Sequence, residues 1–276
     1  MKKIVMLSIA ILFATPAFSA TWSAINRVPT VGKQILTKNN LPASTKFVVT
    51  ETAVTNSTSN ANNEIYIQKT DLGYTGNDNE VAAVISKEIG TIINANASKK
   101  KLVSNITSAL AGSVSGENAQ NKALIVNELA MNNMSEKDQM NADITGTDLM
   151  IQAGYNPLAM IVVLGKMPGS ALDTLKSQPN NYKRSIYIYN YLAYNYPSKV
   201  KSGYNCQEYK NFLAYIEPTI TERNSDKKKL AKFNKEQAKL KAERAKQIAK
   251  YKATGGLNGW DASYTILKNL SESSEK

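Results

Sequence analysis

The hydrophobic pattern along the chain predicts mostly helices, with two short strands near the N-terminal end. After Asp78 or Asn79, either of which is a suitable N-cap, apolar residues recur every three or four positions, and this spacing predicts a helix that ends at Asn94. Alternating apolar and polar residues predict strands at 46–52 and 64–69, one on each side of a loop rich in Asn, Ser and Thr. The predicted fold class is therefore α+β and mainly helical.

The second half of the chain carries further helix signals. A helix is predicted over 135–153, where Ser135 and Asp138 resemble a capping box, and Pro157 is placed to open the next helix at its first turn. Residues 182–215 are rich in tyrosine, and within them the stretch SIYIYNYLAYNY alternates like a strand and also fits a helix, so periodicity leaves both alternatives open there.

The first predicted helix contains a charged residue where an apolar one is expected. On a helical wheel Glu88 falls within the same narrow arc as Val81, Ile85 and Ile92. A carboxylate on an apolar face is costly to desolvate unless it is paired or protonated. We therefore expect a partner across the interface or a cavity that admits water; the alternative is that the helix rolls slightly and Glu88 reaches its edge.

The first twenty residues have the features of a secretory signal peptide. Lys2 and Lys3 precede an apolar run at 4–13, and Ala17 and Ser19 give the small-x-small spacing of a cleavage site. Ten apolar residues are too few to span a bilayer, so a cleaved signal at 1–20 is favoured over an anchor or a retained amphipathic segment. The mature protein is expected to be exported, soluble, and periplasmic or extracellular.

The composition excludes several kinds of active site. The 276 residues contain no histidine and one cysteine, Cys206. Histidine is the commonest general base and metal ligand, so histidine-dependent triads and histidine-bound zinc are excluded. A single cysteine also excludes an internal disulfide, and Cys206 is expected to be either buried and inert or available for pairing between molecules.

The excess positive charge lies mostly near the C-terminus. The chain carries a formal charge of +12, and residues 226–252 contain eleven Lys or Arg against three Asp or Glu. We predict a body at 21–223 and a basic helical tail at 224–276, whose last segment around Trp260 docks on the body. The tail is expected to be a solvated helix or to contact an anionic surface of the envelope or membrane; nucleic acid is not expected, because export removes the chain from it.

Three stretches of the sequence resemble the HtpX-like and CAAX-prenyl-protease-like zinc metallopeptidases, which are gluzincins. The first stretch is EIYIQKTDLGYTGNDNEVAAVISKEIGTIIN, the second is KDQMNADITGTDLMIQAGYNPLAM and the third is SQPNNYKR, at Ser177–Arg184. Their order and spacing agree with the family over about half of the chain. The resemblance implies a gluzincin-like domain in which two helices pack with a small sheet.

The resemblance also implies a zinc site, and this sequence lacks its ligands. Members of the family bind zinc with two histidines on one helix and a glutamate on a second, and another glutamate activates the bound water. Carried over to this chain, the first histidine falls at Lys87, the activating glutamate at Glu88, the second histidine at Thr91, the ligand glutamate at Gln139, the supporting aspartate at Asp143, and the histidine of the third stretch at Gln178. Only Glu88 and Asp143 are retained, so the resemblance predicts that zinc is lost and that the vestigial Glu88 is inactive.

These observations predict an exported pseudopeptidase. In active relatives an edge strand holds an extended peptide by main-chain hydrogen bonds, which need no metal. The vestigial cleft is therefore expected to bind extended polypeptide as an adaptor module. The alternatives are a protein that binds an anionic surface through its basic helix, or a peptidase of the family with unrecognised residual activity.

The lost metal leads to an expectation for Lys87. A cleft that keeps Glu88 and Asp143 without a divalent cation holds two poorly compensated carboxylates. We expect the Lys87 ammonium to lie within about 4 Å of Asp143, and of Glu88 as well, with Gln139 donating a hydrogen bond into the cluster. The alternative is that Lys87 projects into solvent.

Overall fold

The computed structural model describes residues 22–51, 64–110, 136–167 and 181–253. In chain order the elements are α1 (Ala24–Lys38), β1 (Lys46–Thr50), β2 (Glu64–Gln68), α2 (Lys69–Leu72), α3 (Asp78–Leu110), α5 (Glu136–Gln152), α6 (Leu158–Lys166), α8 (Asn181–Asn195), α9 (Pro197–Ser202), α10 (Gln207–Ser225) and α11 (Lys227–Ala253). The signal peptide, the loop after β1, Ser135, Gln178 and the Trp260 segment lie outside the described residues. Across the described ranges, no helix is long and apolar enough to cross a membrane.

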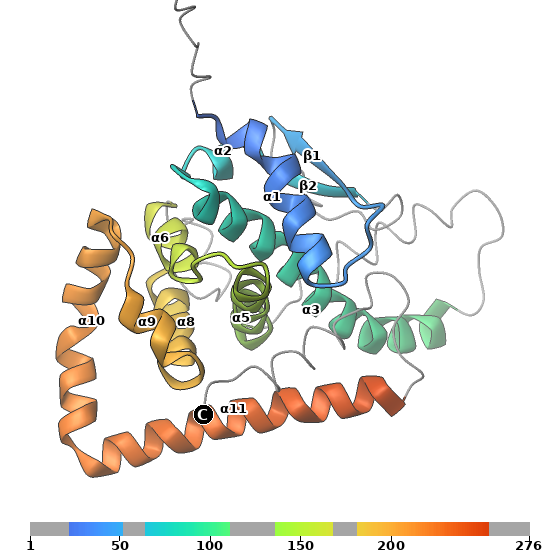
Figure 1. The fold of residues 1–276 in the computed structure, drawn as a ribbon. Coiled ribbons are helices and arrows are strands. Elements are labelled where there is room, and N and C mark those ends of the chain that lie inside the picture. The colour runs from blue at the N-terminus through green and yellow to red at the C-terminus, as the bar shows by residue number, and fades with distance from the viewer. Residues whose placement is uncertain (1–21, 52–63, 111–135, 168–180, 254–276) are drawn as a thin grey trace, which may run out of the picture.

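The mainly helical α+β prediction is confirmed, and the sheet consists of two parallel strands. β1 pairs with β2 from Lys46 opposite Glu64 onward, and both strands end slightly earlier than predicted. Ile65 and Ile67 on β2 are buried in the core. The sheet lies against α1 and α3 (Figure 1). Gly32 on α1 permits the close packing, because a Cβ at this position would lie 2.3 Å from the Phe47 ring of β1.

Helix α3 is longer than predicted and has a different cap. The side-chain oxygen of Asn77 accepts hydrogen bonds from the backbone N–H groups of Asn79 (3.0 Å) and Glu80 (3.2 Å), so Asn77 rather than Asp78 or Asn79 caps the helix. The helix continues well past Asn94. The predicted helix ended at Asn94 because the helical spacing of apolar residues weakens after this position, although the backbone remains helical to Leu110.

The tyrosine-rich stretch forms helices α8, α9 and α10. On α8 the buried side chains are Ser185, Ile188, Tyr191, Leu192 and Asn195, which have helical spacing. The tertiary structure selects the helix because this face packs on α5 and α6, whereas a strand would divide the same residues between two faces.

Helices α3 and α5 make the most extensive helix contact in the described structure. A Cβ at Gly90 would lie 2.3 Å from the carbonyl oxygen of Ala142, and a Cβ at Gly146 would lie 2.7 Å from the carbonyl oxygen of Ser86. The two backbones therefore approach closely only because both positions are glycine. This contact fixes the relative position of the two helices that carry the residues of the matched stretches.

The basic helix α11 packs against the body with one face, so the expectation of a fully solvated helix is wrong for that face. Gln237, Leu240 and Arg244 are buried at helical spacing. Arg244 donates to Asp148 of α5 at 2.9 Å, and the Tyr191 hydroxyl donates to the same carboxylate at 2.9 Å. Figure 1 shows α11 running along one edge of the molecule, nearly at right angles to α10.

The carboxyl group of Asp148, beneath α11, is fully buried, and its pKa is raised. Burial raises the pKa of Asp148 to about 7, although the Arg244 guanidinium and the hydroxyls of Tyr191 and Tyr196 oppose the shift. A buried ion pair of this kind fixes where a helix docks more than it adds to net stability.

The glycine contact between α3 and α5 can be tested by substitution. Gly90→Ala should destabilise the fold by about 1–3 kcal/mol, since the added methyl group meets the backbone of α5. The matched control is Gly165→Ala in α6, where a Cβ meets nothing within 4 Å; it should be neutral or stabilise by about 0.5–1 kcal/mol. Urea unfolding of the two variants measures both effects, and equal stabilities would contradict the close-packing argument.

Candidate functional site

Five charged side chains from four helices form a cluster at the position of the matched stretches. Lys87 of α3 lies 3.1 Å from Asp71 of α2 and 3.3 Å from the adjacent Glu88, measured from its Nζ to the carboxylate oxygens. The three side chains are only 17%, 21% and 11% exposed, respectively. The predicted contact between Lys87 and Glu88 is thus confirmed, and the partner of Glu88 comes from its own helix rather than from across the interface.

The predicted contact between Lys87 and Asp143 is wrong. Asp143 of α5 is paired with Arg184 of α8, whose Nε and Nη2 donate to its two carboxylate oxygens at 2.7 and 2.6 Å. The planar guanidinium matches both oxygens of a carboxylate, whereas an ammonium group cannot bind them in the same fork geometry. Lys87 pairs instead with Asp71, which α2 places beside it.

The environment of Lys87 keeps it protonated. Burial lowers the pKa of this amine, but the carboxylates of Glu88 and Asp71 raise it by more, so the net pKa is above its usual value. The charge of Arg184 opposes this rise in the pKa of Lys87. Lys87 is therefore a permanent cation among carboxylates at neutral pH.

The remaining matched positions hold neutral groups. The Thr91 hydroxyl donates to the backbone carbonyl of Lys87 at 2.9 Å, within its own helix. Gln139 is half-buried on α5, one turn before Asp143, and its hydrogen bond into the cluster stays a prediction. Gln178 lies outside the described residues.

This set of side chains does not fit zinc. Zinc binds through the lone pairs of thiolate, imidazole or carboxylate groups, and a protonated lysine has none to offer. Both oxygens of Asp143 already accept from Arg184, and the Thr91 hydroxyl is directed to its own backbone. In the ranges described, no three or more His, Cys, Asp and Glu side chains gather in a way that could hold a metal ion.

The family assignment rests on the match to a known family pattern. The sequence pattern of Peptidase family M48 matches residues 24–197, more than half of the chain. The chain belongs to Peptidase family M48. No curated protein and no solved structure matches it. The M48 match ends at residue 197, so α10 and the basic helix α11 lie beyond it.

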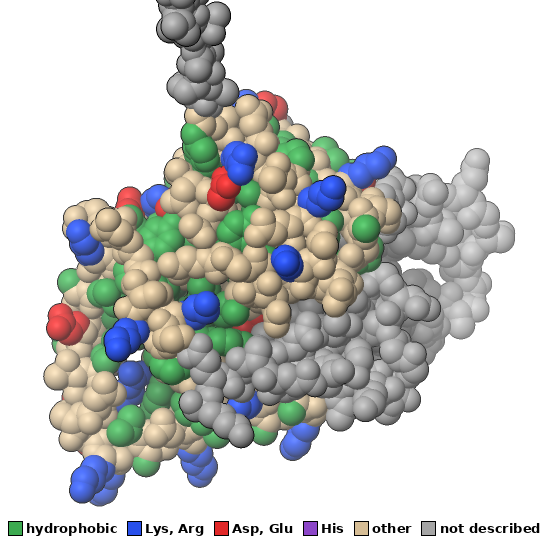
Figure 2. Space-filling model, viewed as in Figure 1, with side chains coloured by type: hydrophobic (Ala, Val, Ile, Leu, Met, Phe, Trp, Pro, Cys, Tyr) green, Lys and Arg blue, Asp and Glu red, His purple; other side chains and the backbone are tan. Residues whose placement is uncertain are grey.

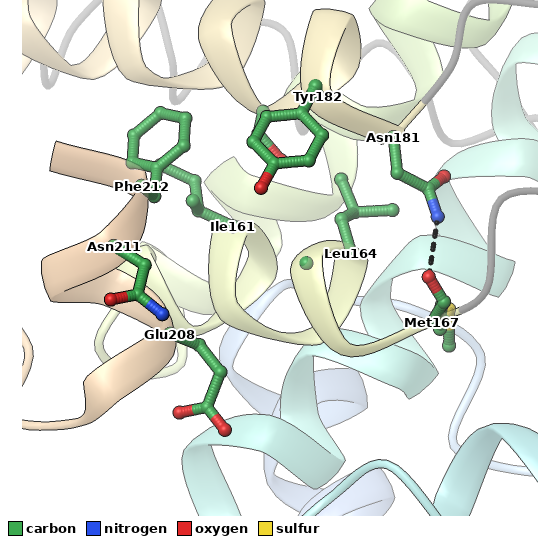
Figure 3. A pocket seen from close by; sticks show the side chains of 10 residues that line it. Ile161, Leu164, Met167, Asn181, Tyr182, Glu208, Asn211 and Phe212 are labelled. Atoms are coloured by element: carbon green, nitrogen blue, oxygen red, sulfur yellow. Dashed lines mark hydrogen bonds between the residues drawn. The ribbon is translucent and has the colours of Figure 1, made fainter. Parts of the chain in front are cut away.

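This M48 chain has a pocket between α6, the start of α8 and α10 (Figure 3). It has a volume of about 260 Å³, and its apolar wall consists of Ile161, Leu164, Met167 and Phe212. Asn181 connects the pocket to the cluster: its amide donates to the carbonyl of Met167 at 3.1 Å, and its oxygen accepts from Arg184 at 3.4 Å. The first turn of α8 therefore borders both the pocket and the ion pair of Asp143.

Two members of the cluster could not be identified as ion-pair partners from the sequence. Arg184 stands in the third matched stretch, but nothing in the sequence indicated that it pairs with Asp143. Asp71 lies between β2 and α3. The sequence distinguishes it only by its place three residues after the end of the strand at Gln68. Both pairings join residues from different elements, so only the tertiary structure reveals them.

The revised pairing of Lys87 predicts which second substitution compensates its loss. Lys87→Met leaves Asp71 and Glu88 without their cation and should lower the free energy of unfolding by about 3 kcal/mol. Adding Asp71→Asn should recover part of this loss, because it removes one uncompensated charge.

The control for this experiment is Lys87→Met combined with Asp143→Asn, which should be less stable still, since Arg184 then loses its carboxylate. Chemical denaturation of the single and double variants measures these differences. Recovery by Asp143→Asn instead of Asp71→Asn would contradict the pairing described here.

Proposed function

We propose that this M48 protein is an exported pseudopeptidase that binds extended polypeptide without hydrolysing it. The observation that carries the proposal is the protonated Lys87, held by Asp71 and Glu88 where the family pattern has its first zinc-binding histidine. A metallopeptidase needs an open metal position and an activated water, and this set of donors supports neither.

Binding of polypeptide is supported by the pocket, which has an apolar wall, and by the exposed ring of Tyr182, which lines it and contacts Tyr215. Tyr182 and Tyr215 are 53% and 61% exposed, and their ring centroids lie 5.0 Å apart. They are two of the four large exposed hydrophobic side chains in the described residues. Exposed aromatic groups around an apolar hollow are typical of a binding site, and the pocket has room for an apolar side chain of a bound chain.

The strand β2 supports the same function from the other side of the cluster. It pairs with β1 along one edge, and within the described ranges no further strand adjoins its other edge. An extended peptide can add to such an edge through main-chain hydrogen bonds. Because Asp71 follows β2 by three residues, a peptide on this edge would end near Lys87.

The loss of hydrolysis can be tested directly. The purified protein should contain no stoichiometric zinc by elemental analysis and should not cleave casein, because Lys87, Thr91 and Gln139 replace the ligands. A positive control is the triple variant Lys87→His, Thr91→His and Gln139→Glu, whose melting temperature should rise when zinc is added. One zinc per parent chain, removable by a chelator together with activity, would instead establish a peptidase with residual activity.

The pocket can be tested with a variant that fills it from within. A Cβ at Gly165 on the pocket wall meets nothing within 4 Å, so Gly165→Leu should fold normally and occupy the hollow. Binding of fluorescently labelled, reduced casein should weaken roughly tenfold, the loss expected when one apolar side chain is no longer buried. Gly165→Ala is the matched control and should bind like the parent. Equal binding by the leucine and alanine variants would rule out this pocket.

A second function, contact with an anionic surface, is favoured by the outer face of α11. The helix carries eight exposed lysines in the part whose side chains the structure describes, Lys227, Lys228, Lys229, Lys232, Lys235, Lys239, Lys241 and Lys246. In that part of the helix Glu236 is the one exposed carboxylate, and Lys229 is paired with Glu222 of α10. This function does not depend on the polypeptide site, and both can occur in one molecule.

A further inference from the structure

Five of the lysines on α11 form a single row, which we call the lysine row: Lys228, Lys232, Lys235, Lys239 and Lys246. They are spaced four, three, four and seven residues apart, which places them on one face of a helix. From the first to the last lysine the row is about 27 Å long, at 1.5 Å per residue. Figure 2 shows Lys and Arg side chains along this edge of the molecule.

The lysine row points away from the body. The buried residues of α11, Gln237, Leu240 and Arg244, lie on the opposite side of the helix from the row. Because Arg244 is paired with Asp148 beneath the helix, α11 cannot rotate about its axis without breaking a buried ion pair. The direction of the lysine row is therefore fixed by the fold.

The row is not balanced by carboxylates. Lys232 lies 4.0 Å from Glu236, and the other four lysines form no ion pair within the described residues. Glu243 is near enough to Lys239 and Lys246 to be affected by their charge, but it is paired with Lys137 at 2.7 Å. Like charges three and four residues apart destabilise a helix, so the helix itself does not favour this arrangement.

In the part of α11 whose side chains the structure describes, the outer face has no large apolar residue that could enter a bilayer. Phe233 packs against Tyr194 with the Arg223 guanidinium over its ring, and Leu240 is buried beneath the helix. Helices that insert into the membrane interface carry an apolar face opposite the charged one, and here the body covers that face. A contact made by the lysine row is therefore electrostatic and superficial.

We propose that the lysine row docks the protein on a bilayer that contains anionic phospholipids, with α11 lying parallel to the surface. The proposal rests on the second proposed function and names its partner and orientation. The complementary charge is the phosphate layer of the lipids. A flat layer can reach all five lysines of a straight row at once, and α11 lies at the edge of the molecule, where such a layer has access (Figure 1).

The test compares two triple variants that each lose three lysines and therefore have the same net charge. One variant carries Lys232→Gln, Lys235→Gln and Lys239→Gln in the row; the control carries Lys199→Gln, Lys201→Gln and Lys210→Gln at exposed positions on α9 and α10. Glutamine and lysine have similar helix propensities, so both should fold. Binding to vesicles of phosphatidylcholine with phosphatidylglycerol is measured by co-sedimentation, with pure phosphatidylcholine vesicles as the uncharged reference.

The parent should bind the anionic vesicles only, and its binding should be lost at high salt because exposed charges are screened. The row variant should bind about a hundredfold more weakly, since each lysine near an anionic surface contributes about a factor of five. The control variant should stay close to the parent. Equal weakening in both variants would overturn the lysine row as the docking face.

Two further outcomes separate this inference from the second proposed function. Tighter binding to an oligonucleotide or to inorganic polyphosphate than to the vesicles would overturn the bilayer as partner and would leave an anion-binding function in place. No binding to vesicles, oligonucleotide or polyphosphate at low salt would overturn both the inference and that function. Neither outcome affects the polypeptide site, which Gly165→Leu tests separately.

Discussion

The approach of α3 to α5 over Gly90 and Gly146 determines where every charged group of the site can lie. With the two backbones in contact, Lys87 and Glu88 on one helix and Asp143 on the other are held close together in a region with little solvent. Carboxylates in such a region need positive charge nearby, because their desolvation is costly. Two other helices complete the compensation. Arg184 of α8 supplies a positive charge to Asp143, and Asp71 of α2 supplies a negative charge to Lys87. The cluster therefore results from close helix packing combined with the need to compensate each buried charge.

The distribution of charge shows how this M48 chain compensates the carboxylates around Lys87 and Arg184. One divalent cation among carboxylates would be shared by several groups, whereas here two monovalent cations each take their own partners. Arg184 takes both oxygens of Asp143, and Lys87 holds Asp71 and Glu88. Such pairs fix geometry more than they add stability, since the attraction only offsets the desolvation of both partners.

Helix α11 has a different role on each of its two faces. Its inner face contributes Leu240 and the Arg244 guanidinium, which reaches the buried Asp148, and these contacts fix the rotation of the helix. Its outer face then presents the lysine row, in which Lys232 alone lies within 4.0 Å of a carboxylate of the described residues, Glu236 of the same helix. The same α5 carries Asp143 toward the cluster and Asp148 toward α11, so one helix connects the charged cluster to the basic edge of the molecule.

Local sequence determined the mainly helical fold class, helices α3, α5, α6 and α11 and the two strands, because hydrophobic spacing reports which face of a segment is buried. It also placed five of the matched positions on two helices, Lys87, Glu88 and Thr91 on one and Gln139 and Asp143 on the other, and it excluded histidine chemistry. It did not determine that α1 forms, that the tyrosine-rich stretch is helical, or that Asn77 caps α3. Above all, the choice of partners was decided by the tertiary structure: Asp143 takes Arg184 and Lys87 takes Asp71, although the sequence suggested that Lys87 and Asp143 would pair. The physical reason is that an ion pair depends on which side chains from distant segments reach the same point with matching geometry, and the spacing within a segment carries no information about this.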